Sequence, residues 1–404
     1  MNIVFGVIIG LVVLMALVVA HEFGHFIMAR RNGVTVKEFG IGFPPRAVAW
    51  RRNPDWQKGN GQKKWLRLPK ADWNKPQDTL VFSLNWLPIG GFCSMDGESD
   101  ADTRTGTFGA TSFWSKTKIL FGGVVMNWLV AFVLLTILAF TGMPQFIDHQ
   151  FYLGNDAEMI GGGVTVAEIM QGSPAEQAGF QVGDKVTHIG EQAVLIPSDV
   201  IVYGEEHAGQ TASYTIERDG KEIVLTADLN KPDADYILGV AMAYGQTYIR
   251  SSWSAPLVGA GLTLQLTGET FRGLGGMVWN LISGVFSQFS ADSTVRENGQ
   301  AAIAEAGDSV SGPVGIIGVI FPAFAESGLA NLTFLAALIS VSLACMNVLP
   351  IPALDGGRWL LIALYRLRGK KLEKAVEEKI VSRAFMVLII LIVLITLLDI
   401  TRLF

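Results

Sequence analysis

Residues 18–30 read VVAHEFGHFIMAR and place two histidines and a glutamate at the end of an apolar N-terminal run. That run, from about residue 3 to residue 24, is long enough to cross a lipid bilayer. An acid or base at the centre of such a helix costs about 2.5–3.5 kcal/mol on insertion scales. We therefore expect an interaction that offsets the cost of burying His21, Glu22 and His25.

The composition is typical of a membrane protein with several spans. The chain has 404 residues, of which 50% are hydrophobic and 17% are charged, and its two cysteines are too few for a disulfide framework. A further stretch, 252–287, mixes apolar residues with Ser, Gly and charged residues, and it predicts one or two interfacial, amphipathic helices. Four stretches are apolar and long enough to span: 3–24, 118–141, 331–349 and 384–401.

The charges of the connecting segments predict an orientation. Residues 30–117 carry a net charge of +6 and residues 358–383 a net charge of +5, whereas residues 143–333 carry −15. Lys and Arg near the ends of spans favour the cytoplasmic side. Both basic segments are therefore expected in the cytoplasm, and the acidic segment and both termini outside.

The acidic segment contains a β-rich region at 159–245. Within it, GSPAEQAGFQVGDKVTHIG (172–190) predicts a short helix that ends at Gly179. This stretch resembles a bacterial PDZ domain, and such domains commonly bind a peptide strand at a sheet edge. The alternative is a β-rich spacer without a ligand.

The sequence HEFGH fits the pattern H-E-x-x-H. Residues four apart lie on one face of a helix, so His21 and His25 can present nitrogens to one metal ion. Glu22, beside the first histidine, could activate a water molecule. Hydrolytic zinc sites use three protein ligands, although other divalent metals accept similar ligands. The alternative is a pair of satisfied histidines at a membrane interface.

A third ligand is expected from MNVLPIPALDGG (346–357). Here the third span breaks at Pro350 and Pro352, and broken helices occur at membrane depth where they line protein or a water-filled cavity. The carboxylate of Asp355 would suit zinc. Taken alone, Asp355 could instead be the N-cap of the helix that follows.

Together these motifs resemble the site-two protease family of intramembrane zinc metalloproteases. The resemblance rests on HEFGH, NVLPIPALDGG, GGVVMN, FSLNWLPIGGFCSMDGE and SGPVGI. It implies a mainly α polytopic membrane protein with about four transmembrane helices, a re-entrant β-loop and an inserted α+β PDZ-like domain. The implied parts are a catalytic half (1–142), the PDZ-like domain (159–245), interfacial helices with a linker (252–325) and a C-terminal membrane half (331–404).

The resemblance also implies a mechanism and a location. Zinc would be held by His21, His25 and Asp355, and Glu22 would act as general base and later as proton donor. The site would lie near the cytoplasmic side of a bacterial inner membrane, with the PDZ-like domain outside as a gate or size filter. The substrates would be transmembrane segments of single-span proteins, such as anti-sigma factors or remnant signal peptides. Members of the envelope-stress subgroup often carry two PDZ domains, and only one copy is visible here.

Substrate-binding residues are expected in two places. The run TLVFSLNWLPIGG (79–91) could pair with an extended substrate through Ser83, Asn85, Gly90 and Gly91. Asn347 could bond a substrate carbonyl or an oxyanion. The alternatives are a hairpin without a substrate role and, for Asn347, a helix–helix hydrogen bond. Asn127 is expected to serve packing rather than chemistry.

Two other functional classes compete with a protease. One is a membrane-anchored PDZ adaptor with a vestigial metal site, which the joint presence of His21, Glu22, His25 and Asp355 disfavours. The other is a metal-dependent transporter, which the lack of a second broken helix disfavours. Nothing in the sequence suggests a phosphate-binding loop or nucleic-acid recognition.

Overall fold

The computed structural model divides the chain into two compact units. Unit 1 comprises Met1–Ile137 with Gly259–Phe404, and unit 2 comprises Leu138–Val258. The described residues are 3–57, 62–73, 75, 77, 79–147, 149–194, 197–218, 220–234, 236–245, 247–290, 292–308, 311–370 and 372–403.

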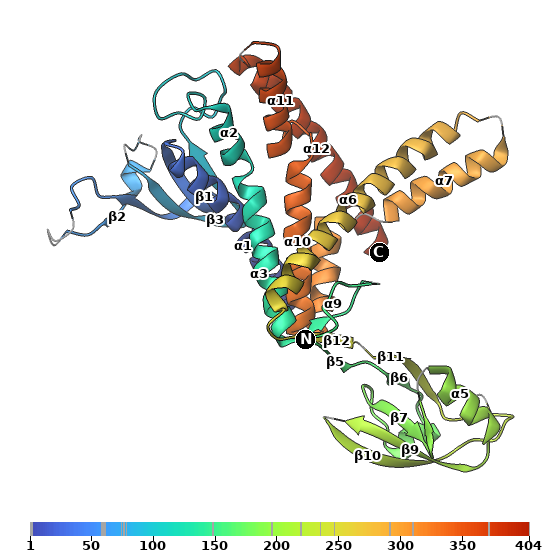
Figure 1. Ribbon diagram of the computed structural model, residues 1–404. Coiled ribbons are helices and arrows are strands. Elements are labelled where there is room, and N and C mark those ends of the chain that lie inside the picture. The colour runs from blue at the N-terminus through green and yellow to red at the C-terminus, as the bar shows by residue number, and fades with distance from the viewer. Residues whose placement is uncertain are drawn as a thin grey trace. The chain divides into compact units, whose positions relative to one another are not determined.

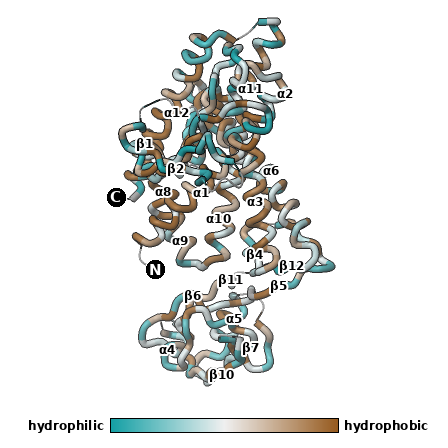
Figure 2. Tube along the Cα trace, turned by 90° about the vertical axis from the view of Figure 1, so that its left-hand side faces the viewer, coloured by the Kyte–Doolittle hydropathy of each residue, from teal (hydrophilic) through white to brown (hydrophobic). Residues whose placement is uncertain are grey.

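Unit 1 contains four helices that are long and apolar enough to cross a membrane, among the residues described. They are α1 (Ile3–Arg31), α3 (Gly122–Thr141), α10 (Leu329–Val348) and α12 (Lys374–Leu403) (Figure 1). They coincide with the four predicted stretches, and the hydrophobic colour follows α3 in Figure 2. The first and last helices extend beyond their predicted stretches, because charged residues continue both helices at one end.

Glycines allow α1 to approach the start of α3. A Cβ atom on Gly24 would overlap the carbonyl of Gly122, and one on Gly122 would lie 2.8 Å from the Gly24 oxygen. Just before this contact lies α2 (Phe113–Leu120). Its N-cap is Ser112, whose hydroxyl accepts a hydrogen bond from the Ser115 N–H. Small residues at such a crossing bring helix backbones close together.

A three-stranded sheet in the order β2-β1-β3 follows α1 in the chain. The long strands β1 (Val36–Arg52) and β3 (Val81–Met95) are bent, so that Phe39 lies opposite both Cys93 and Phe82. The short strand β2 (Trp65–Arg67) pairs with the far end of β1. Where the strands bend, the tip exposes Phe43, Trp86, Leu87 and Ile89.

The stretch 252–287 forms one helix, α6 (Ala255–Ser287), which folds back into α7 (Ser293–Asp308) as a helical hairpin (Figure 1). Gly284 and Gly299 face each other at close range within this hairpin. Leu262 and Leu266 of α6 are buried, whereas the distal half of α6 exposes apolar side chains. The helix therefore has one end packed in unit 1 and an amphipathic end that projects.

The last helix, α12, forms hydrogen bonds with other elements near both of its ends. A short helical segment runs through α8 (Pro313–Gly315), a π-helical turn (Ile316–Ile320) and α9 (Phe321–Glu326). At its start, the N–H groups of Gly312 and Gly315 donate to the buried carboxylate of Asp399 at 3.1 and 2.8 Å. At the other end of α12, the buried Glu377 accepts from the Ser99 hydroxyl and the Asp100 N–H, both at 3.1 Å.

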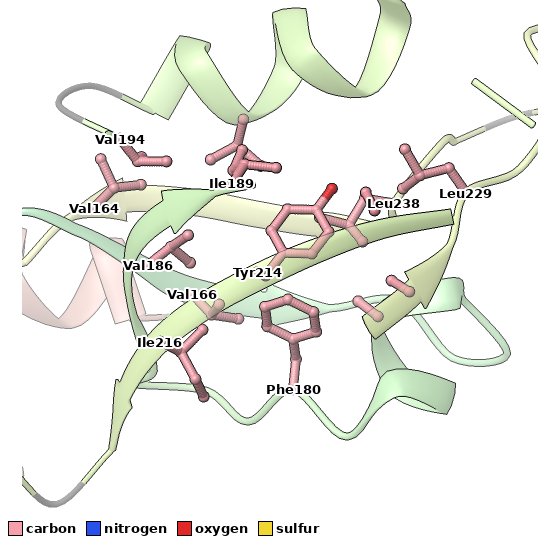
Figure 3. Packing of buried hydrophobic residues seen from close by; sticks show 14 residues of the cluster. Val164, Val166, Phe180, Val186, Ile189, Val194, Tyr214, Ile216, Leu229 and Leu238 are labelled. Carbon is pink, nitrogen blue, oxygen red and sulfur yellow. The ribbon is translucent and has the colours of Figure 1, made fainter. Parts of the chain in front are cut away.

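Unit 2 is built around a sheet in the order β10-β9-β7-β6-β11, with β8 paired to β7. Its core includes Tyr214, which packs edge-on against Phe180 with ring centroids 5.4 Å apart (Figure 3). The predicted short helix is confirmed as α4 (Pro174–Ala178), capped by Ser173 and ended by Gly179 with φ +85°. The strands and the second helix are β6 (Val164–Ile169), β7 (Lys185–Ile189), β8 (Gln192–Ala193), α5 (Pro197–Glu206), β9 (Thr211–Arg218), β10 (Lys221–Asp228) and β11 (Val240–Tyr244).

A small second sheet in unit 2 has the order β4-β12-β5. It consists of β4 (Met143–Pro144), β5 (Ala157–Gly161) and β12 (Thr247–Ser251). Close to it, the carboxylate of Asp156 accepts hydrogen bonds from Ser252 and Ser254, which lower its pKa to about 2. Because β5 and β12 pair, the chain leaves and re-enters this sheet at adjacent positions.

The Asp399 contact yields the first testable prediction. Asp399→Ala leaves two N–H groups in an apolar setting without their acceptor, at about 1–3 kcal/mol each. We expect a lower midpoint of thermal unfolding in detergent, with Asp399→Asn between alanine and wild type because it keeps one acceptor oxygen. The control is Thr396→Ala on the same helix, whose hydroxyl donates to the Ile392 carbonyl within α12. An unchanged midpoint in Asp399→Ala would contradict the prediction.

Candidate metal centre

Helix α1 presents His21 and His25 on one face, as the spacing predicts. Both residues are 8% exposed, and their Nε2 atoms lie 3.1 Å apart. The two rings are nearly perpendicular, with centroids 4.8 Å apart. With Glu22 they form a group whose ligand atoms all lie within 4.8 Å of one another.

Asp355 reaches these histidines from the other end of the chain. Helix α10 ends at Val348, and Asp355 opens α11 (Asp355–Leu367) after the break at Pro350 and Pro352. The carboxylate Oδ2 lies 3.1 Å from Nε2 of His21 and 3.3 Å from Nε2 of His25. The structure thus brings the three predicted ligand residues together.

The spacing of these three atoms fits a single zinc ion. Zn–N and Zn–O distances of 2.0–2.2 Å in a tetrahedral site separate the ligand atoms by about 3.4 Å. The observed separations are 3.1–3.3 Å. Two imidazole nitrogens and one carboxylate oxygen also form a donor set of catalytic zinc sites.

Glycines at two close backbone contacts leave space for the groups of the candidate site. A Cβ atom on Gly123 would lie 2.6 Å from Nε2 of His21 and 2.7 Å from Nε2 of His25. After Asp355, a side chain on Gly356 would overlap the carbonyl of Val348. Glycine is therefore required both opposite the histidines and directly after the carboxylate.

The second nitrogen of each imidazole also has a partner. His25 Nδ1 lies 2.8 Å from the backbone oxygen of Ile119, and His21 Nδ1 lies 3.3 Å from the amide Nδ2 of Asn127. Sequence analysis missed both contacts. The carbonyl of Ile119 leaves no signal in the sequence, whereas Asn127 follows Gly123 by one helical turn and so shares its face.

Glu22 lies between the candidate ligand residues and β3. The backbone N–H of Cys93 is directed toward its carboxylate. The carboxylate therefore lies beside the histidines and faces the strand. A carboxylate placed in this way can accept and return a proton.

The predicted substrate-binding residues occupy different settings. Asn85 is buried, and its amide donates to the carbonyls of Ile41 and Gly42 and to the hydroxyl of Ser83. The amide of Asn347 donates to the Leu343 carbonyl in its own helix at 2.9 Å.

Gly90 and Gly91 face α1 instead. Cβ atoms on them would lie 3.2 and 3.1 Å from side-chain atoms of Val18 and Val19, so this part of β3 packs one turn from His21. Gly90 also has φ +74°, which favours glycine at the bend of the strand.

Comparison with known proteins agrees with this geometry. The model of Peptidase family M50 matches residues 9–56 and 68–392. The regulator of sigma-W protease RasP of Bacillus subtilis is 25% identical over 457 residues, covering 98% of this chain and 99% of that protein. The zinc metalloprotease RasP of Oceanobacillus iheyensis is 24% identical, covering 96% and 97%. A protein of Fusobacterium nucleatum named as a zinc metalloprotease is 26% identical, covering 98% and 99%. The chain belongs to Peptidase family M50, the site-two proteases, and is a zinc metalloprotease.

Proposed function

We propose that this protease cuts transmembrane segments of single-span membrane proteins, with zinc held by His21, His25 and Asp355. The observation that carries the proposal is the triangle of ligand atoms with sides of 3.1–3.3 Å. Two of its corners belong to a helix that is apolar enough to span a membrane. A hydrolytic site in that position is suited to peptide bonds in the bilayer rather than in bulk water.

In this mechanism Glu22 is the general base. It removes a proton from the attacking water and later delivers a proton to the leaving amine. Bound zinc supplies Lewis acidity, which lowers the pKa of that water and polarises the scissile carbonyl. The Cys93 N–H orients the Glu22 carboxylate.

The substrate helix must unwind before it can be cut. Unwinding in lipid strands backbone groups, each at a cost of several kcal/mol, unless the enzyme supplies partners. In the sheet, residues 81–84 of β3 pair with 38–41 on one side and with 48–51 on the other. Residues 91–95 pair only with 36–41, so within the described residues their other edge has no strand beside it.

The free edge of 91–95 is the proposed docking strand for the substrate. Backbone groups alternate between the two edges of an antiparallel strand. The N–H of Cys93 points to Glu22, at the free edge. The N–H and C=O of Gly91, two residues away, therefore point to the same edge. Of the predicted run 79–91, only its end thus lies at a free edge, whereas Ser83 and Asn85 support the sheet from within. The exposed apolar tip around Trp86 and Ile89 suits a re-entrant position in lipid.

The substrate class is proposed from similarity. RasP of Bacillus subtilis is named as a regulator of sigma-W protease. We extend this to anti-sigma factors as substrates of the present chain, with remnant signal peptides as a second class. The basic segments at 30–117 and 358–383 support a site near the cytoplasmic face of a bacterial inner membrane.

Unit 2 is proposed to be a PDZ-like, extracytoplasmic domain that limits access of bulky substrates. The acidic charge of residues 143–333 supports this location. A cavity of about 490 Å³ lies between α5 and the edge strand β11, and its lining includes Val200, Leu238 and Met242. A cavity beside an edge strand suits a peptide ligand added to the sheet.

Glu22→Gln tests the catalytic assignment. We expect the purified variant to bind zinc like the wild type and to cleave a panel of transmembrane peptides about 10²–10⁴-fold more slowly, because the general base is lost. Glu373→Gln, at an exposed position of unit 1, is the matched control. Activity that survives in Glu22→Gln would refute the mechanism, and zinc binding without wild-type cleavage would favour an adaptor.

Cross-linking to Cys93 tests substrate docking on the free edge. In a Glu22→Gln, Cys345→Ala background, Cys93 is the only cysteine of the chain. Single cysteines scanned through a substrate's transmembrane segment should form disulfides at every second position, because an extended strand has a period of two. Cys93→Ser is the control that should abolish all products. A period of three to four residues would mean that the substrate stays helical there.

Removal of residues 164–244 tests the access role of unit 2. Gly245 N–H donates to the Gly163 carbonyl at 2.8 Å, so a short linker can close the chain at this point and leave β5 and β12 paired. We expect the variant to cleave substrates with intact outer domains as readily as truncated ones, whereas wild type prefers truncated ones. The same deletion with Glu22→Gln controls for other proteases. An unchanged preference would count against the role.

A further inference from the structure

We propose that Asn127 is a positioning residue, which accepts the Nδ1 proton of His21 and thereby directs Nε2 toward zinc. The inference rests on the proposed function, in which His21 is a ligand. It assigns to a buried asparagine of α3 a role that differs from helix packing.

His25 provides the reference for this assignment. Its Nδ1–H donates to the Ile119 carbonyl at 2.8 Å, which leaves the Nε2 lone pair directed at the ligand group. Metal-binding histidines generally donate their second N–H to such an acceptor, which fixes the tautomer and the ring orientation. His21 needs the same tautomer, because its Nε2 lies 3.1 Å from both His25 Nε2 and Asp355 Oδ2.

The group that faces Nδ1 of His21 is the amide of Asn127. Its Nδ2 lies 3.3 Å from Nδ1, while its Oδ1 is buried and has no partner among the described residues. Nδ2 and a protonated Nδ1 are both donors and cannot bond to each other. A half-turn of the amide exchanges its nitrogen and oxygen, which are assigned from the hydrogen-bond network, and gives the proton an acceptor.

Packing alone does not account for Asn127. The residue is fully buried, and a polar atom left without a partner there carries a desolvation cost that a leucine of similar size avoids. Its backbone is also fixed, because the hydroxyl of Ser340 on α10 donates to the Asn127 carbonyl at 2.8 Å. Helices α3 and α10 lie side by side (Figure 1), and α10 leads to Asp355. The Asn127 residue is thus held at a defined position relative to both His21 and the helix that leads to Asp355.

The test compares Asn127→Leu with Asn127→Asp in the full-length chain. The readouts are the zinc dissociation constant from chelator competition, the absorption spectrum of the cobalt-substituted protein, and thermal unfolding of the metal-free form. We expect leucine to weaken zinc binding by about 10–100-fold and to alter the cobalt spectrum. Aspartate, which keeps an oxygen toward His21, should retain wild-type affinity or exceed it. A packing role predicts the reverse order, because leucine suits an apolar helix contact and a buried charge does not.

Asn331→Leu is the matched control. Asn331 is also a buried asparagine of a spanning helix, but its amide donates to the Ser327 carbonyl, and zinc affinity should not change. If Asn127→Leu does not fold, Asn127→Ala is measured with the same three readouts. Wild-type zinc affinity in Asn127→Leu, or an equal loss in Asn127→Asp, would overturn the inference. A wild-type protein that binds no zinc would instead refute the proposed metal site itself.

Discussion

The close contact between α1 and α3 is the constraint on which the site depends. Two helices normally pack 8–10 Å apart, with side chains between their backbones. At this contact three positions have no side chain: Gly24, Gly122 and Gly123. The space opposite Gly123 is occupied by the imidazoles of His21 and His25. The glycine inside HEFGH therefore serves the helix contact, while the histidines around it are the proposed zinc ligands. Both functions fall on one turn of α1, because residues three and four apart share a face.

The cost of burying polar groups on the apolar helices is offset by hydrogen-bond partners within the protein rather than by water. His25 has the Ile119 carbonyl, His21 has the Asn127 amide, and Asp399 has two backbone N–H groups. These interactions join elements that are far apart in sequence. Lipid offers no hydrogen bonds, so each such group restricts the packing to arrangements that supply its partner. The same groups that are costly to bury thereby specify how the helices meet.

The sequence was sufficient for the features that depend on local pattern. Helix periodicity placed both histidines on one face, length and hydropathy located four candidate spans, and Gly179 marked the end of α4. Features that depend on pairing were not predictable. The run 79–91 alternates like a strand, but which of its edges is free depends on a bend that lets β1 cover two parts of β3. Likewise, a backbone carbonyl such as that of Ile119 is present in every residue, so nothing marks it as a partner of His25.

The way the chain leaves unit 1 explains how a site can be split by a large insertion. Helix α3 ends where unit 2 begins, and α6 begins where unit 2 ends. Within unit 1 these two helices touch, since a Cβ atom on Gly259 would lie 2.9 Å from the backbone nitrogen of Thr136. The chain therefore departs and returns at neighbouring points, and such points tolerate inserted domains because few contacts are interrupted. His21 and Asp355 accordingly meet at 3.1 Å although more than 300 residues separate them in sequence.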